Sequence, residues 1–116
     1  MISWNTALTE RIKSGTIANV MFFGDDKRPA PPCVVIKPIG GTDRTVIQFY
    51  IHGEMGSQDD LEAYALKELP ELLRAPLEVE DKATKLFDTK QYIAGIANSD
   101  DGTISVRRDF YIPLLF

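Results

Sequence analysis

Residues 103–116 read Thr-Ile-Ser-Val-Arg-Arg-Asp-Phe-Tyr-Ile-Pro-Leu-Leu-Phe, and every even position in this stretch except Arg108 is apolar. A period of two is typical of a β-strand with one buried face. The last strand of the chain should therefore need a cover. We expect that cover to be either the protein's own helix or another copy of the chain.

A candidate for the covering helix lies upstream, where an apolar stripe at three- and four-residue spacing is formed by Leu61, Ala65, Leu69, Leu72 and Leu73. This spacing predicts an amphipathic helix that packs on the sheet. Ser57 and Asp60 have the spacing of a capping box, so the helix should start near Gln58. Because Pro70 has no backbone N–H, we expect a kink or a restart there.

Three β-prone runs precede this helix, at residues 19–23, 33–39 and 45–52. The turn-rich link 40–44 joins the second run to the third, so these two are expected to pair antiparallel. The third run is apolar on both faces, which is typical of a central strand. Residues 25–32 hold three prolines and four charges and predict a surface loop.

The remaining elements are a short helix over residues 2–13, strands at 84–88 and 91–97, and a polar turn before the last strand. The order α-β-β-β-α-β-β-β favours an α+β fold. We expect a mostly antiparallel sheet of about five to six strands with one long and one short helix packed on one face. A chain of 116 residues fits a single domain, residues 1–116.

Composition excludes several classes of function. Hydrophobic residues at 44% and charged residues at 26% are typical of a folded globular protein. A formal net charge of -4 disfavours a sequence-independent nucleic-acid binder, which needs a basic face. We find no basic leader followed by an apolar stretch and no run of membrane-spanning length, so we expect a cytoplasmic chain with no membrane partner.

The sequence offers little catalytic chemistry. His52 and Glu54 share one face only if the strand continues through Gly53, and acid–base catalysis there is the less favoured interpretation. Cys33 lies in an apolar run and is interpreted as a core thiol. With one histidine and one cysteine, a metal site would have to be all carboxylate. We therefore expect no enzyme activity, no catalytic residue, no metal and no cofactor.

Arg108 is the exception in the apolar row of the last strand, with Arg107 on the opposite face and Asp109 next to it. One explanation is that Arg108 lies near the sheet edge and extends its guanidinium to solvent. The other is that it pairs with a carboxylate across a subunit boundary, since arginine suits interface ion pairs.

Several segments together resemble the tail terminator and tail completion proteins of long-tailed bacteriophages and prophages. They are a Pro-rich loop leading into Pro-x-Val-Val-Ile, a strand Arg-x-Val-Ile-Gln-Phe-Tyr-Ile, a helix with an acidic start and a final hairpin ending Arg-Arg-Asp-Phe-Tyr-Ile. The likeness runs from about Thr6 to Phe116 and depends on the succession of elements more than on fixed residues. Pro70 within the long helix departs from the family pattern.

The resemblance implies a structural protein of the virion. Its copies would form a ring, commonly hexameric, that caps the tail tube, ends its polymerisation and joins the tail to the head connector. Implied partners are further copies of the chain, the tail-tube protein and the head-completion or connector protein. DNA would pass through the lumen without specific binding, and the ring would be assembled in the cytoplasm of a bacterial host.

Physical reasoning agrees with a ring, because a ring closes through heterologous contacts between two different edges of the subunit. An acidic chain also suits a lumen that DNA must pass through, because like charge keeps the wall from binding phosphates. The candidate interface residues, drawn from the Pro-rich loop and the last strand, are Asp25, Asp26, Lys27, Arg28, Arg107, Arg108, Tyr111 and Leu115.

One alternative function remains open at this point. A small cytoplasmic ligand-binding or regulatory domain could use the sheet face as a pocket, with His52 and Arg108 as polar anchors.

Overall fold

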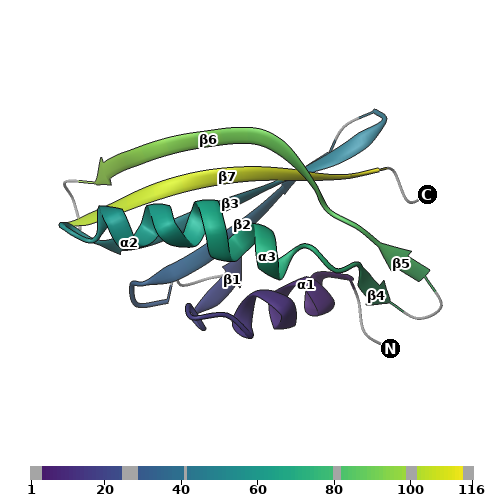
Figure 1. Ribbon diagram of the computed structural model, residues 1–116, viewed down its shortest axis with the longest axis horizontal. Helices are drawn as coiled ribbons and strands as arrows, with labels where there is room; N and C mark the ends of the chain where they lie inside the picture. The colour runs from purple at the N-terminus through teal and green to yellow at the C-terminus, as the bar shows by residue number, and fades with distance from the viewer. Residues whose placement is uncertain (1–3, 25–28, 41, 80–81, 99–101, 114–116) are drawn as a thin grey trace.

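The computed structural model describes residues 4–24, 29–40, 42–79, 82–98 and 102–113 (Figure 1). The predicted interface residues Asp25, Asp26, Lys27, Arg28 and Leu115 lie outside these ranges.

The main sheet has five strands in the order β1-β2-β3-β7-β6. Their bounds are β1 Val20–Phe22, β2 Cys33–Ile39, β3 Arg44–Glu54, β6 Phe87–Asn98 and β7 Thr103–Pro113. β1 pairs parallel to β2, and the other neighbours pair antiparallel. A second, two-stranded sheet is formed by β4 (Leu77–Val79) and β5 (Lys82–Thr84).

The α+β class, the mostly antiparallel sheet and the central place of the third strand are thereby confirmed, with β3 between β2 and β7. The strand predicted at 33–39 forms with those bounds. The region after the long helix differs from the prediction, because β5 and the single long strand β6 replace the strands expected at 84–88 and 91–97.

The helices lie on one face of the main sheet (Figure 1). They are α1 (Trp4–Lys13) and a longer helical segment made of α2 (Gln58–Ala63), the π-helical turn η1 (Tyr64–Glu68) and α3 (Leu69–Leu72). The predicted stripe packs inward, and Leu61, Ala65 and Leu69 are each at most 3% exposed. On the sheet side the core includes Phe49, Val106 and Phe110. The helices of the same chain therefore cover the even positions of β7. The sequence had allowed two covers, the protein's own helix or another copy, and the first is the one that forms.

The start of the long helix is at Gln58 as predicted, but Ser57 does not cap it. The Ser57 hydroxyl instead donates to the Glu54 carbonyl at 2.6 Å. The π-helical turn immediately precedes the α-helical turn that contains Pro70. A proline cannot donate to the carbonyl four residues before it, so the helix changes its winding at this point rather than stopping.

Arg11 joins the two helical segments. Its guanidinium donates to the carbonyl oxygens of Leu72, Ala75 and Pro76 at 3.0, 2.7 and 3.0 Å. These carbonyls lie at and beyond the end of α3, where the helix itself supplies no donor, so Arg11 satisfies them.

The edge strand β6 is irregular where it faces β7, with register shifts between Asp88 and Tyr92 and between Ile93 and Ile96. At the first shift Lys90 has a positive φ of 68°. Two side chains hold this bulge: Asp88 Oδ1 accepts the Lys90 N–H at 2.7 Å, and Thr89 Oγ1 accepts the Gln91 N–H at 3.1 Å. Thr89 Oγ1 also donates to the Asp109 carbonyl at 2.8 Å and so ties the bulge to β7.

The bulge predicts opposite effects of two substitutions at Lys90. Lys90→Gly should unfold at equal or higher denaturant concentration, because glycine adopts a positive φ without a steric penalty. Lys90→Val should lose about 1 kcal/mol or more, because a β-branched residue is strongly disfavoured there. Equal stability of the two variants in urea titrations would contradict this description of the bulge.

Candidate functional site

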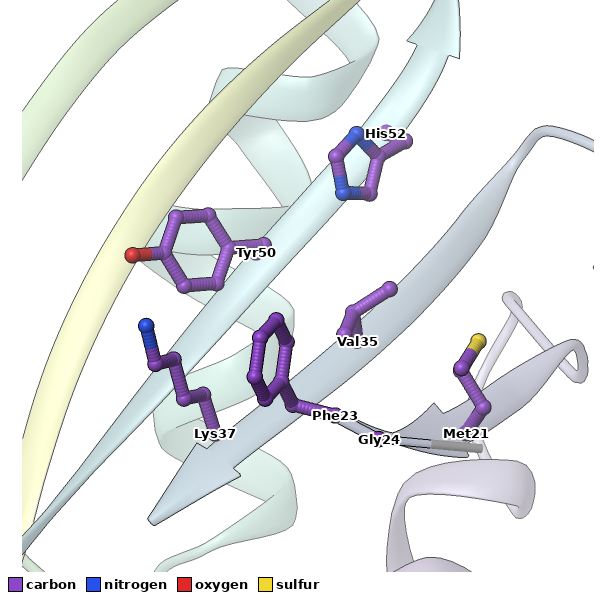
Figure 2. A pocket seen from close by; sticks show the side chains of 7 residues that line it. All are labelled: Met21, Phe23, Gly24, Val35, Lys37, Tyr50 and His52. Carbon is purple, nitrogen blue, oxygen red and sulfur yellow. The ribbon is translucent and has the colours of Figure 1, made fainter. Parts of the chain in front are cut away.

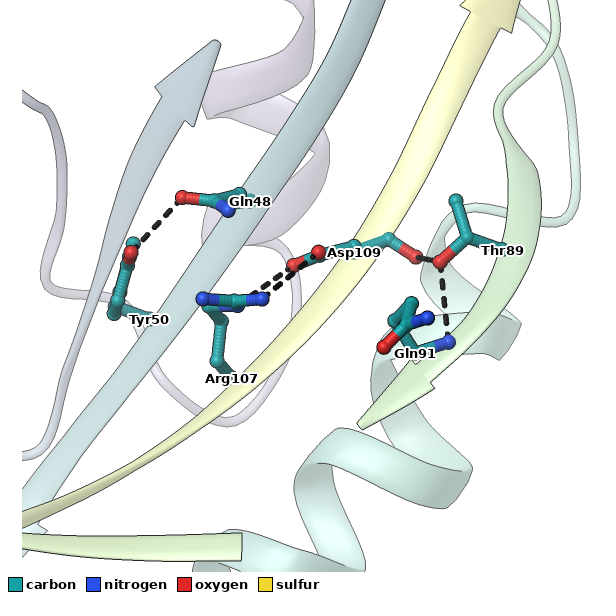
Figure 3. Close-up of polar contacts among 6 residues, drawn as sticks. All are labelled: Gln48, Tyr50, Thr89, Gln91, Arg107 and Asp109. Atoms are coloured by element: carbon teal, nitrogen blue, oxygen red, sulfur yellow. Dashed lines mark hydrogen bonds and ion pairs between the residues drawn. The ribbon is translucent and has the colours of Figure 1, made fainter. Parts of the chain in front are cut away.

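The face of the main sheet opposite the helices is named the open face. Pairing register places on it alternate residues of β2, β3 and β7, including Val35, Lys37, Gln48, Tyr50, His52, Arg107, Asp109 and Tyr111. In the close-ups the helices lie behind the sheet, with Val35, Lys37, Tyr50 and His52 in front of it in Figure 2 and Gln48, Arg107 and Asp109 in front of it in Figure 3. Within the part of the chain that the structure describes, no helix lies over this face.

A groove of about 500 Å³ opens on this face (Figure 2). Its walls include Met21, Phe23, Val35, Lys37, Tyr50 and His52. Phe23 is 64% exposed, and the Lys37 ammonium lies 4.6 Å from the centroid of its ring. The rings of Tyr50 and His52 are stacked, with centroids 6.4 Å apart. The groove is therefore mainly aromatic and apolar, with a cation at its rim.

A polar cluster occupies the middle of the open face (Figure 3). Arg107 binds Asp109 through two contacts, Nε to Oδ1 at 3.0 Å and Nη2 to Oδ2 at 3.2 Å. On the neighbouring strand the Tyr50 hydroxyl donates to Gln48 Oε1 at 2.9 Å. Asp109 and Gln48 are only 6% and 9% exposed. The side chains of this cluster are therefore bonded to one another. Arg107 lies on the face opposite the apolar row, as predicted, and its carboxylate partner is in the same chain.

Next to this cluster the open face is aromatic. Tyr111 stacks on Phe87 with ring centroids 5.4 Å apart, and the Arg44 guanidinium lies 4.7 Å from the Tyr111 ring. The Lys85 ammonium lies 5.7 Å from the Phe87 ring, and Phe87 is 39% exposed. Cations therefore accompany the rings at this end of the face too.

Arg108 lies on the other face, among the side chains that the helices cover, and is 5% exposed. Its Nη2 binds Asp88 Oδ2 at 2.5 Å, while Asp88 Oδ1 holds the Lys90 N–H of the bulge. The carboxylate partner belongs to the same chain, which corrects the expectation of a pair across a subunit boundary. Edge exposure is also wrong for this residue, because β6 lies between it and the sheet edge. Arg108 anchors the bulge through Asp88.

The predicted pocket anchored by His52 and Arg108 does not form, because the two side chains lie on opposite faces of the sheet. β3 does continue through Gly53 to Glu54. The side chains of His52 and Glu54 nevertheless border different depressions. Glu54 lines one together with Ser57 and Asp60, and His52 lines the open-face groove. Cys33 is fully buried, as expected of a core thiol.

The described residues contain no cluster of three or more His, Cys, Asp or Glu side chains suited to a metal ion. Within the same residues no helix is long and apolar enough to cross a membrane.

Tyr92 connects the edge strand to the long helix, since its hydroxyl donates to Glu62 Oε1 at 3.0 Å. Burial, together with this bond to a carboxylate, raises the pKa of Tyr92 to about 12 from its ordinary 10.0, while nearby Arg108 acts in the opposite direction. In the unfolded chain the phenol ionises first, so the stability that its neutral form contributes is complete below pH 10.0 and is lost as the pH rises toward about 12.

We therefore expect Tyr92→Phe to flatten the alkaline decline of stability. The measurement is urea denaturation at a series of pH values on both sides of 10.0. Parallel alkaline declines in the wild type and the variant would show that the Tyr92 phenol does not contribute.

Sequence reasoning missed most of the open face. Phe23, Lys37, Arg44 and Phe87 come from segments far apart in the chain, and only the strand register brings them together. No local motif interleaves their charges and rings. Alternation along each predicted strand would have assigned some of these residues to the same face of the sheet. It could not have shown which of them lie side by side on neighbouring strands.

No protein-family model and no curated protein sequence matches this chain. A solved structure superposes on it with a TM-score of 0.61 at 15% sequence identity, covering 97% of this chain and 92% of the other. A likeness at this identity shows a shared fold. The class that the observations define is thus an α+β protein whose helices cover one face of a five-stranded mixed sheet.

Proposed function

We propose that this protein is a structural component of a phage tail that assembles into a closed ring, as the tail terminators that its sequence resembles do. The ring would cap the tail tube, end tube polymerisation and present a surface to the head connector. Its partners would be its own copies, the tube protein and the connector, and its location would be the head–tail junction of the virion.

The observation that carries this proposal is the open face. Within the described residues the helices pack on one side of the sheet, and the other side holds Phe23 at 64% exposure next to β1 and Phe87 at 39% exposure in β6, at opposite edges of the sheet. The Arg107–Asp109 ion pair lies on β7 between these edges. Phe23 lines the groove together with Met21 and Tyr50, and Phe87 stacks on Tyr111. Exposed apolar side chains in groups rimmed by polar ones are typical of surfaces that other molecules cover. Coverage by protein is consistent with a ring subunit.

A second candidate is a small ligand-binding or regulatory domain, which the open-face groove of about 500 Å³ favours. Pockets of this size with aromatic walls and a single cation suit a small ligand that has an apolar body and one anionic group. Binding of such a ligand by a stable monomer would favour this second function.

The proposed function is tested on tube assembly. We expect purified protein, added to the polymerising tube protein of the same tail, to bind tube ends and shorten the tubes seen by electron microscopy. Light scattering should detect a ring of six as six times 13.0 kDa, or 78.0 kDa. Tubes of unchanged length, with no protein at their ends, would contradict the proposal.

A further inference from the structure

We propose that the open face of one copy docks on the helical face of a second copy, so that the subunits join front to back. This inference rests on the proposed ring and names the two surfaces that form its repeated contact. The helical face is the solvent side of the segment that runs from α2 through η1 to α3, together with the turn that ends it, residues 58–74.

The open face is cationic although the whole chain has a net charge of -4. The cations that contact its rings or its polar cluster are Lys37, Lys85, Arg44 and Arg107. Asp109 is the carboxylate bound among them, at 3.0 Å from Arg107. These five side chains sum to a formal charge of about +3, which suits an acidic partner surface.

The helical face has the complementary charge. Residues 58–74 carry five carboxylates, at Asp59, Asp60, Glu62, Glu68 and Glu71, against Lys67 and Arg74. Asp59, Asp60 and Glu71 are exposed, and so is Leu66, at 46%. An apolar side chain within an acidic surface complements an open face that presents rings among cations.

The arrangement of the two surfaces produces a heterologous contact. They lie on opposite sides of the same sheet, so each copy offers one to the copy before it and the other to the copy after it (Figure 1). Contacts of this kind form a ring when the rotation between successive copies closes after a whole number of copies, and an open filament when it does not. The molecule measures 42 × 28 × 24 Å, and a face of its two longer dimensions has room for the roughly 800 Å² per partner of a standard interface.

A single-stranded nucleic acid is the competing occupant of a cationic, aromatic surface. Base stacking needs open ring faces, whereas cations of the same chain already lie over Phe23, Tyr111 and Phe87. Covering the open face with a neighbouring copy also removes these cations from a lumen that DNA must pass without being held. The chain's own acidic helical face is therefore the favoured occupant.

Two charge-reversed variants test the contact. The first is Lys37→Glu with Arg44→Glu on the open face, and the second is Asp59→Lys with Asp60→Lys on the helical face. Each variant alone places like charges in the contact, so we expect self-association in light scattering to weaken at least about tenfold.

The decisive sample is the equimolar mixture of the two variants. A reversed open face then meets a reversed helical face at one contact, and two unchanged surfaces meet at the next. Copies should alternate, and the mixture should recover wild-type association. If two open faces met by two-fold symmetry instead, Asp59→Lys with Asp60→Lys would associate like the wild type on its own. Circular dichroism checks that each variant is folded. If the reversed open face misfolds, Lys37→Gln with Arg44→Gln replaces it, with a smaller loss expected.

A matched control reverses charges outside both surfaces, with Lys82→Glu and Glu78→Lys on the exposed parts of β5 and β4. The control should associate like the wild type. Three results would overturn the inference: a wild-type protein that stays monomeric, an unrescued mixture, and binding of a fluorescent single-stranded oligonucleotide that Lys37→Glu with Arg44→Glu abolishes while association is unchanged. Tube termination that persists in any of these cases would leave the proposed function standing.

Discussion

Asp88→Ala is expected to lower the free energy of unfolding by about 3 kcal/mol. The substitution leaves the Arg108 guanidinium, whose side chain is 7% exposed, without its carboxylate, and it frees the Lys90 N–H of the bulge. An uncompensated buried charge is among the most destabilising changes that a single substitution makes. Urea denaturation measures the loss.

The reciprocal variant Arg108→Met serves as the comparison. It removes the charge but keeps most of the apolar volume, and the Asp88 side chain that remains is 32% exposed and can be hydrated. We expect a loss of about 1 kcal/mol, clearly smaller than that of Asp88→Ala. The double variant should be less destabilised than the sum of the two single variants. Equal losses from both single variants would show that the two ends of the pair are buried alike, against the structure.

The second large effect is expected at the centre of the core. Phe49→Ala should lower the free energy of unfolding by about 4 kcal/mol. Phe49 is fully buried on the central strand, and its ring meets that of Phe110 edge to face with centroids 5.7 Å apart. Truncation leaves a cavity under the helices, which thermal and urea denaturation would both report.

Tyr50, the next residue, provides the matched control, because it points to the open face. Tyr50→Ala should cost the folded monomer about 1 kcal/mol and should instead weaken self-association. Similar losses of stability at the two positions would mean that both faces of β3 are covered within one chain, and the open face would then not be available to a partner.

Much of the fold follows from periodicity. The alternation in β7 and the stripe of Leu61, Ala65 and Leu69 each identify a buried face, and the two faces do meet. β3 is apolar on both sides and lies at the centre of the sheet. These patterns were predictive because burying one face of a strand or a helix places apolar residues at the period of that element, two for a strand and about 3.6 for a helix.

The bulge in β6 and the role of Arg108 could not be predicted in the same way. A bulge shifts the register within a strand, so a simple alternation from Phe87 to Asn98 does not say which residue opposes Arg108. The alternation therefore could not predict that Arg108 pairs with the partly exposed Asp88. The pairing of β1 parallel to β2 likewise depends on the path of the chain between them rather than on local pattern.

The open face escaped prediction for a related reason. Its rings and cations are each unremarkable in their own strands, and they form a surface only after the strands are placed in register. Sequence reasoning found no interleaved aromatic and basic residues along the chain. The structure places Lys37 by Phe23 and Arg44 by Tyr111 across different segments.

The front-to-back contact is tested most directly by a zero-length cross-linking experiment on the assembled protein. A carbodiimide joins a lysine amine to a carboxylate with loss of water, and an equimolar mixture of heavy and light isotopic copies distinguishes links between copies from links within one. A front-to-back contact predicts mixed-isotope links from Lys37 on the open face to Asp59 or Asp60 on the helical face. An assembled sample whose links between copies join other surfaces, with none between these two, would contradict it.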